Sequence, residues 1–123
     1  MSGIGRSLGL CLASLVLGGA GDRDRGYAVV SRQTSTCVLC HAGPFPNPHL
    51  QGTIGPDLRG VGARLDAEAI RERLVDASRM NPDTVMPSFG VVEGTRVGAA
   101  WSGRPILSSQ EIEDATAYLA GLR

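Results

Sequence analysis

Two cysteines and a histidine stand close enough in the chain to hold one cofactor. Cys37 and Cys40 are separated by two residues, and His41 follows directly. Two thiols at this spacing can bond to the two vinyl groups of one haem, and the adjacent histidine can then ligate the iron. The spacing predicts one covalently attached haem c, with thioether bonds to Cys37 and Cys40 and with His41 as an axial ligand.

A Cys-x-x-Cys pair also occurs in redox dithiols and in zinc sites. A zinc site needs two further ligands, and the only other histidine, His49, lies beyond three prolines. A thioredoxin-like dithiol is expected within a βαβ unit, of which the sequence shows no sign. We therefore favour haem over a zinc protein or a haem-free dithiol oxidoreductase.

An iron held by His41 has a sixth position, for which Met80, Met86 and His49 are the candidates. Met86 is expected in a loop and is followed by Pro87, which can hold the thioether rigidly. Met80 is expected at the end of a helix, where methionine more often fills gaps in a core. We predict Met86 as the second axial ligand, and such a ligand suits electron transfer rather than oxygen activation.

A histidine that ligates a metal normally donates its second ring nitrogen to a fixed acceptor. A backbone carbonyl near Gly55-Pro56 is the expected acceptor for His41, and we name Pro56. The same turn could serve only to pack Leu58 into the core, and the two roles are compatible. Trp101 and Tyr27 could pack at a haem edge or in the core.

The elements that position these residues are expected to be helices joined by long loops. A short helix is predicted from Tyr27 into the cysteine motif, and a second from the N-cap Asp66 to about Arg79. Residues 42–62 contain four prolines and five glycines, which exclude a long regular element. Loops are also expected over 82–90 and 91–105.

The last helix has the clearest pattern. Ser108-Ser109-Gln110-Glu111 matches a capping box, and Ile112, Ala115, Leu119 and Leu122 recur on one face. No stretch alternates as a sheet would require. The predicted fold is mostly α, with three or more helices and long loops wrapped around one haem.

The first twenty residues resemble an export signal. A basic Arg6 precedes an apolar stretch over 8–17, which is too short for a membrane span of about 20 residues. We predict cleavage after Ala20, so that residues 1–20 are a signal peptide and 21–123 form one periplasmic domain without a membrane anchor. Cleavage would also remove Cys11 and leave Cys37 and Cys40 as the only cysteines.

The charge pattern excludes some partners. Twelve basic residues, all arginine, balance twelve acidic ones, and like charges do not gather in blocks. Neither nucleic acid nor an anionic membrane surface is therefore an expected partner. Docking through a ring of lysines is excluded as well.

Beyond the haem motif, further segments resemble the SoxX family, the monohaem cytochrome c subunits of the SoxAX complex of bacterial sulfur (thiosulfate) oxidation. The similarity covers most of the chain after the signal. It includes Gly52-Thr53-Ile54-Gly55-Pro56-Asp57-Leu58, Val61-Gly62-Ala63-Arg64, Asn81-Pro82-Asp83-Thr84-Val85-Met86-Pro87-Ser88-Phe89, Ile106-Leu107 and residues 113–119.

The resemblance implies a class I cytochrome c fold with His41 and Met86 as axial ligands. It also implies a periplasmic heterodimer with a SoxA-type cytochrome, which joins thiosulfate to a cysteine of a SoxYZ-type carrier protein. In that L-cysteine S-thiosulfotransferase, this chain would be the non-catalytic electron-transfer subunit and would pass electrons to a small cytochrome c or another acceptor. The alternative is a freely diffusing class I cytochrome c that serves another respiratory chain.

Overall fold

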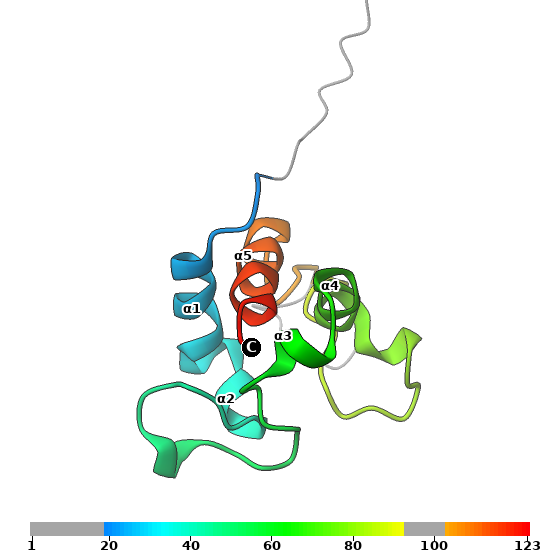
Figure 1. Cartoon of the computed structure of the whole chain (residues 1–123). Helices are drawn as coiled ribbons and strands as arrows, with labels where there is room; N and C mark the ends of the chain where they lie inside the picture. The colour runs from blue at the N-terminus through cyan, green and yellow to red at the C-terminus, as the bar shows by residue number, and fades with distance from the viewer. Residues whose placement is uncertain (1–18, 93–102) are drawn as a thin grey trace, which may run out of the picture.

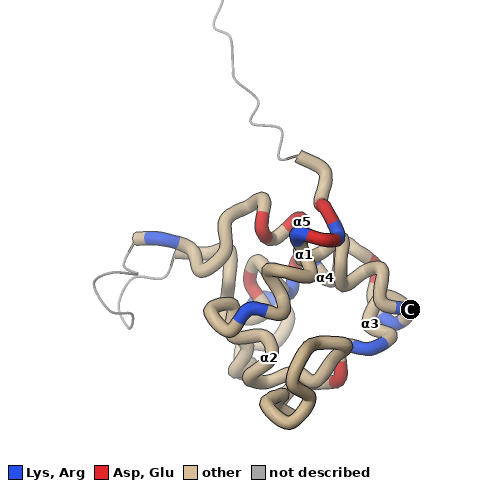
Figure 2. The backbone as a smooth tube through the Cα atoms, turned by 90° about the vertical axis from the view of Figure 1, so that its left-hand side faces the viewer, with Lys and Arg blue, Asp and Glu red and all other residues tan. Residues whose placement is uncertain are grey.

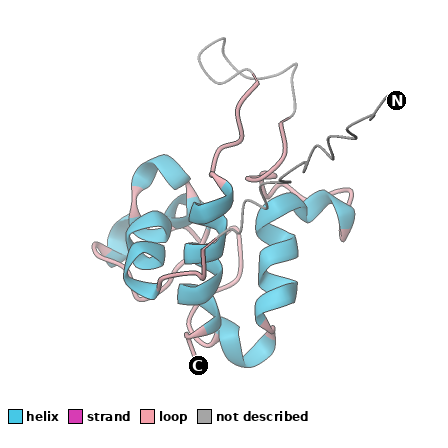
Figure 3. Ribbon diagram, turned by 90° about the horizontal axis from the view of Figure 1, so that it is seen from above, coloured by secondary structure: helices cyan, strands magenta, loops and turns pink. Residues whose placement is uncertain are grey.

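The computed structural model describes residues 19–92 and 103–123, and within these ranges the chain forms helices and loops without a strand (Figure 1, Figure 3). The α-helices are α1 (Arg23–Ser31), α2 (Cys37–Cys40), α3 (Val61–Arg64), α4 (Ala67–Asp76) and α5 (Ser109–Ala120). The same described ranges contain the short 3-10 helices η1 (Gln33–Ser35), η2 (Pro48–Leu50) and η3 (Ala77–Arg79). The mostly helical fold is thereby confirmed.

The first helix differs from its prediction at both ends. It begins at Arg23, before Tyr27, because the Asp22 side chain caps it by accepting a hydrogen bond of 2.8 Å from the backbone nitrogen of Arg25. It ends at Ser31, and the prediction that it runs into the cysteine motif is wrong. Thr36 adopts a left-handed conformation with φ of 62°, which separates α2 from the turns before it.

The two later helices begin where the sequence predicts. Asp66 caps α4 by accepting from the backbone nitrogen of Ala69 at 2.8 Å. Ser108 and Glu111 form both bonds of a capping box at the start of α5. The stretch between α2 and α3 contains only η2, which agrees with its content of proline and glycine.

Helices α1 and α5 lie side by side and form the frame of the fold (Figure 1). Gly26 makes the close approach possible, because a Cβ atom there would lie 1.9 Å from the carbonyl oxygen of Asp114. Arg25 then binds both carboxylate oxygens of the buried Asp114, at 2.8 and 3.0 Å. This bidentate pair ties the beginning of the domain to its last helix.

The core lies between α1, α4 and α5 and extends into the loops that follow α2 and α4. Its buried apolar side chains are Val29, Val30, Phe45, Leu58, Val61, Ile70, Leu74, Phe89, Leu107, Ile112, Ala115 and Leu119. Phe45, Leu58 and Phe89 belong to loops, so the loops are packed segments of the domain. In the part of the chain that is described, no helix has the length and apolarity needed to cross a membrane.

Candidate haem-attachment site

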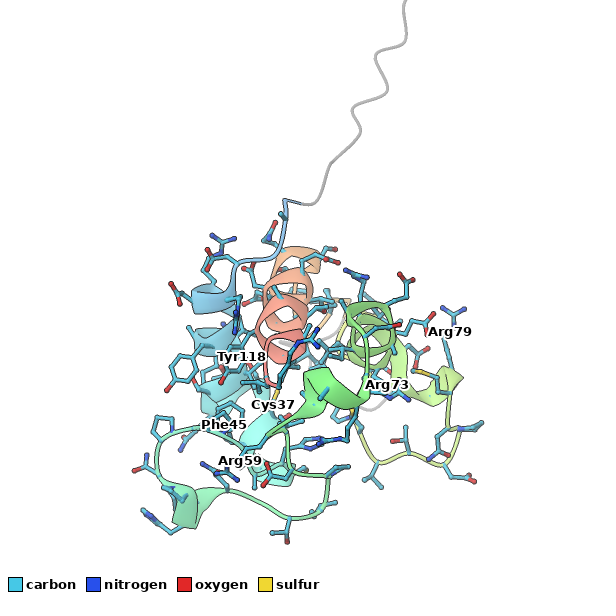
Figure 4. The ribbon with its side chains drawn as sticks, in the orientation of Figure 1. Cys37, Phe45, Arg59, Arg73, Arg79 and Tyr118 are labelled. Carbon is cyan, nitrogen blue, oxygen red and sulfur yellow. The ribbon has the colours of Figure 1, made fainter. Side chains whose placement is uncertain are left out.

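Helix α2 is a single turn that presents both cysteines together. Cys37 and Cys40 stand three residues apart, so their side chains emerge on the same side of the turn. Both are partly buried, and Cys37 packs against the core and points from α2 into the molecule (Figure 4). His41 then leaves the helix with extended backbone, while its backbone nitrogen still donates to the carbonyl oxygen of Cys37 at 2.9 Å.

The surroundings of the cysteines do not suit a redox dithiol or a zinc ion. Burial raises the pKa of the Cys37 thiol to about 11, whereas the attacking thiol of a dithiol oxidoreductase has a lowered pKa. Within residues 19–92 and 103–123, no three His, Cys, Asp or Glu side chains gather so that they could hold a metal ion. A structural zinc ion needs four such ligands.

A turn between η2 and α3 fixes the ring of His41. Its Nδ1 atom lies 2.7 Å from the carbonyl oxygen of Pro56, the acceptor that the sequence predicts. Because a carbonyl only accepts, Nδ1 must carry the proton, and Nε2 is left with its lone pair for a metal. Gly55 lies flat against the ring: a Cβ atom there would be 2.3 Å from the Cε1 atom of His41.

The same turn is bonded to the backbone around the cysteine motif. The nitrogens of Gly52, Gly55 and Leu58 donate to the carbonyl oxygens of Val38, Cys40 and Ala42, at 2.8, 2.7 and 2.8 Å. At Gly52, a Cβ atom would lie 1.9 Å from the carbonyl oxygen of Leu39. No role of Gly52 or Gly55 in packing is predicted from the sequence, although their spacing before Pro56 is a signal for such a turn.

The three candidates for the sixth position have different environments. Met86 is partly buried and packs against the core, between two exposed neighbours, Val85 and Pro87. Met80 is 40% exposed at the end of η3 and lines an open groove with charged residues of α4. His49 is exposed in η2.

The two predicted sides of the iron site come from different loops. Figure 1 shows α2 and the loop that follows η3 on the same side of the molecule, below α3 and α4 in that view. The donor set fits a haem c: two thiols on one turn, an imidazole with a free Nε2 and a thioether on a separate loop. Their roles stay predictions.

Tyr27 and Trp101 are the aromatic residues for which the sequence allows either a haem edge or the core. Tyr27 stacks edge to face on Tyr118, with ring centroids 5.6 Å apart, at the junction of α1 and α5. Phe45 also contacts Tyr118, with ring centroids 6.4 Å apart and the rings tilted by 46°. Tyr27 therefore joins a cluster between helices, whereas Trp101 lies outside the described residues.

Comparisons with known proteins agree with the sequence resemblance. No family model matches the chain, and no curated protein sequence matches it. Among solved structures, the crystal structure of SoxXA from P. pantotrophus contains a chain that is 34% identical, with a TM-score of 0.75. The match covers 85% of this chain and 84% of that one. The extent and identity of this match confirm the predicted fold, and the chain belongs to the SoxX family of c-type cytochromes.

Proposed function

We propose that this chain is the electron-transfer subunit of a haem-dependent L-cysteine S-thiosulfotransferase in thiosulfate oxidation. The observation that carries the proposal is the match to a chain of SoxXA over most of both lengths. Joining thiosulfate to a cysteine thiol forms one S–S bond and releases two electrons, so the reaction needs an electron acceptor. This chain takes the electrons away and does not itself act on the sulfur.

Cys37 and Cys40 would hold one haem c by thioether bonds, and His41 and Met86 would ligate its iron. When bound, the haem supplies reversible one-electron exchange at its iron. The carbonyl of Pro56 keeps the proton on Nδ1 of His41, and Gly55 supports the ring face. The neutral thioether of Met86 favours ferrous iron, which suits an acceptor of electrons.

The surface near α2 supports a lasting partner such as a SoxA-type subunit. No Asp, Glu, Arg or Lys occurs between Arg32 and Asp57, and Figure 2 draws the tube of α2 in the colour of uncharged residues. Leu39 and Ile54 on this stretch are 56% and 74% exposed. Exposed apolar side chains without charges favour contact by burial over electrostatic steering of a diffusing carrier.

Co-expression with a SoxA-type cytochrome tests the proposal. We expect the exported chain to carry one covalent haem by its pyridine haemochrome spectrum and to co-purify with the partner in a salt-insensitive complex. Ile54→Glu should release the partner, whereas Ala28→Glu, the same charge on the exposed side of α1, should not. A haem protein that ignores the partner and reduces other acceptors would instead support the freely diffusing carrier.

Haem attachment and partner binding are separate steps in this proposal. In the proposed sequence of events, the chain is exported to the periplasm, residues 1–20 are removed, and the haem is attached there. The N-terminal sequence of the exported protein tests the cleavage. A chain without covalent haem would exclude both the subunit and the carrier, and would leave a haem-free dithiol protein.

A further inference from the structure

The chain segment that follows Met86 is tied to the end of α4. The hydroxyl of Ser88 donates to Oδ1 of Asp76 at 2.7 Å. The next two nitrogens, of Phe89 and Gly90, donate to the carbonyl oxygens of Leu74 and Val75 at 3.0 and 3.1 Å. The loop that leaves α4 therefore returns to the last turn of the same helix (Figure 1).

One carboxylate oxygen joins the two limbs of this loop. Oδ1 of Asp76 accepts from the backbone nitrogen of Ser78 at 3.2 Å and also from the Ser78 hydroxyl. The same atom accepts from Ser88. Ser78 lies on the outgoing limb, one residue beyond the start of η3, and Ser88 lies on the returning limb, two residues after Met86. Hydrogen bonds to a carboxylate are the stronger kind, because the acceptor is charged.

The hydrogen bonds of residues 83–86, which lead into Met86, are local. Asp83 and Thr84 both donate backbone nitrogens to Asn81, and Met86 donates its own to the hydroxyl of Thr84 at 3.2 Å. Each of these bonds joins residues two or three positions apart. In the described chain, the side-chain bond that connects this loop to a helix near Met86 is the one between Ser88 and Asp76.

Only Pro87 separates Met86 from Ser88. A proline ring fixes its own φ near −65° and restricts the backbone of the residue before it. Fixing Ser88 therefore also restricts the backbone position of Met86. Phe89, 2% exposed, anchors the far side of Ser88 in the core.

We propose that Asp76 is a positioning residue for Met86: its carboxylate fixes Ser88, and through the rigid Pro87 it holds the thioether in place as the iron ligand. The inference rests on the proposed function, in which Met86 is that ligand. In this proposal Asp76 acts on Met86 through its hydrogen bond with Ser88.

Two serine substitutions in the full-length haem protein test the clamp. Ser88→Ala and Ser78→Ala each remove one hydroxyl from the same oxygen of Asp76, but only the first frees the limb next to Met86. The measurements are the sulfur-to-iron absorption at the red edge of the ferric spectrum and the affinity for imidazole, which competes with the thioether. We expect Ser88→Ala to weaken the absorption and to tighten imidazole binding about tenfold, equivalent to about 1.4 kcal/mol.

The remaining outcomes separate the clamp from the ligand assignment. Ser88→Thr keeps the hydroxyl and should restore both measurements, and Ser78→Ala should resemble the wild type even if its unfolding midpoint falls. Equal effects of Ser88→Ala and Ser78→Ala would overturn the clamp alone. A wild-type protein that carries covalent haem but lacks the absorption would overturn the Met86 assignment, and the clamp with it.

Discussion

Gly55 offers a direct test of how the imidazole of His41 is held. An added Cβ atom would lie 2.3 Å from Cε1, 2.6 Å from Nδ1 and 2.8 Å from Nε2 of the ring. The glycines with positive φ in the described chain are Gly60 and Gly103, so backbone strain does not require glycine at position 55. Gly55→Ala must therefore act by pushing the ring away from the carbonyl of Pro56.

The expected cost combines two effects. Overpacking a fixed site costs about 1 to 3 kcal/mol, and loss of the hydrogen bond between His41 and Pro56 adds about 1 kcal/mol. The sum of about 2 to 4 kcal/mol is a large part of the roughly 5 to 15 kcal/mol that stabilises a domain. For a chain of this size, it should lower the Tm by roughly 8 to 20 °C.

The assay combines thermal unfolding with redox titration of the haem protein. Gly62→Ala is the matched control, because its Cβ atom would meet the carbonyl oxygen of Ala120 at 2.1 Å, away from His41. Both variants should lose stability, but only Gly55→Ala should change the reduction potential, since the ring loses its fixed acceptor. A Gly55→Ala protein with the wild-type Tm and potential would refute the reasoning.

Three further predictions concern the ligands, the thioethers and the acid stability. Met86→Ala should abolish the sulfur-to-iron absorption while Met80→Ala keeps it, and the opposite result would transfer the assignment. Cys37→Ala or Cys40→Ala should leave at most one thioether, which the shifted haemochrome band would report, while an unchanged band would exclude covalent attachment at that residue. The Arg25 guanidinium lowers the pKa of Asp114 to about 2 from 3.8, so this carboxylate stabilises the fold above about pH 4, and that stability is lost as the pH falls toward 2. Urea unfolding across this range should show that the free energy of unfolding falls, and Asp114→Asn should make this fall smaller.

The features that the sequence predicts well are those that neighbouring residues determine. The caps at Asp66 and Ser108 act within three residues, so their patterns could be recognised without tertiary contacts. The haem motif is equally local, because one turn carries both thiols. The break at Thr36 could not be foreseen, since a left-handed threonine has no distinctive pattern and is held by its surroundings.

The missed features depend on residues that are distant in the sequence. Arg25 and Asp114 are 89 positions apart, and neither local sequence indicates that the two residues form a pair. Gly52 and Gly55 are recognisable as turn formers, but the close approach of Gly52 to Leu39 and of Gly55 to the ring of His41 appears only when the loop is folded over α2. Both cases are decided by packing between elements, which local propensity does not encode.

The two proposed axial ligands are held in the same way, which would suit the proposed electron transfer. Neither His41 nor Met86 lies within a helix, yet each is held by a loop that is bonded to one: the turn at Gly55 to the backbone of α2, and the segment after Met86 to the end of α4. A loop can place its side chain without obeying helical spacing, while hydrogen bonds to a helix remove the freedom that a loop would otherwise have. Ligands held in this way keep their geometry when the charge on the iron changes, as supported sites do in general. A haem site with two such supports would favour rapid exchange of electrons with a docked partner over binding of a new ligand at the iron.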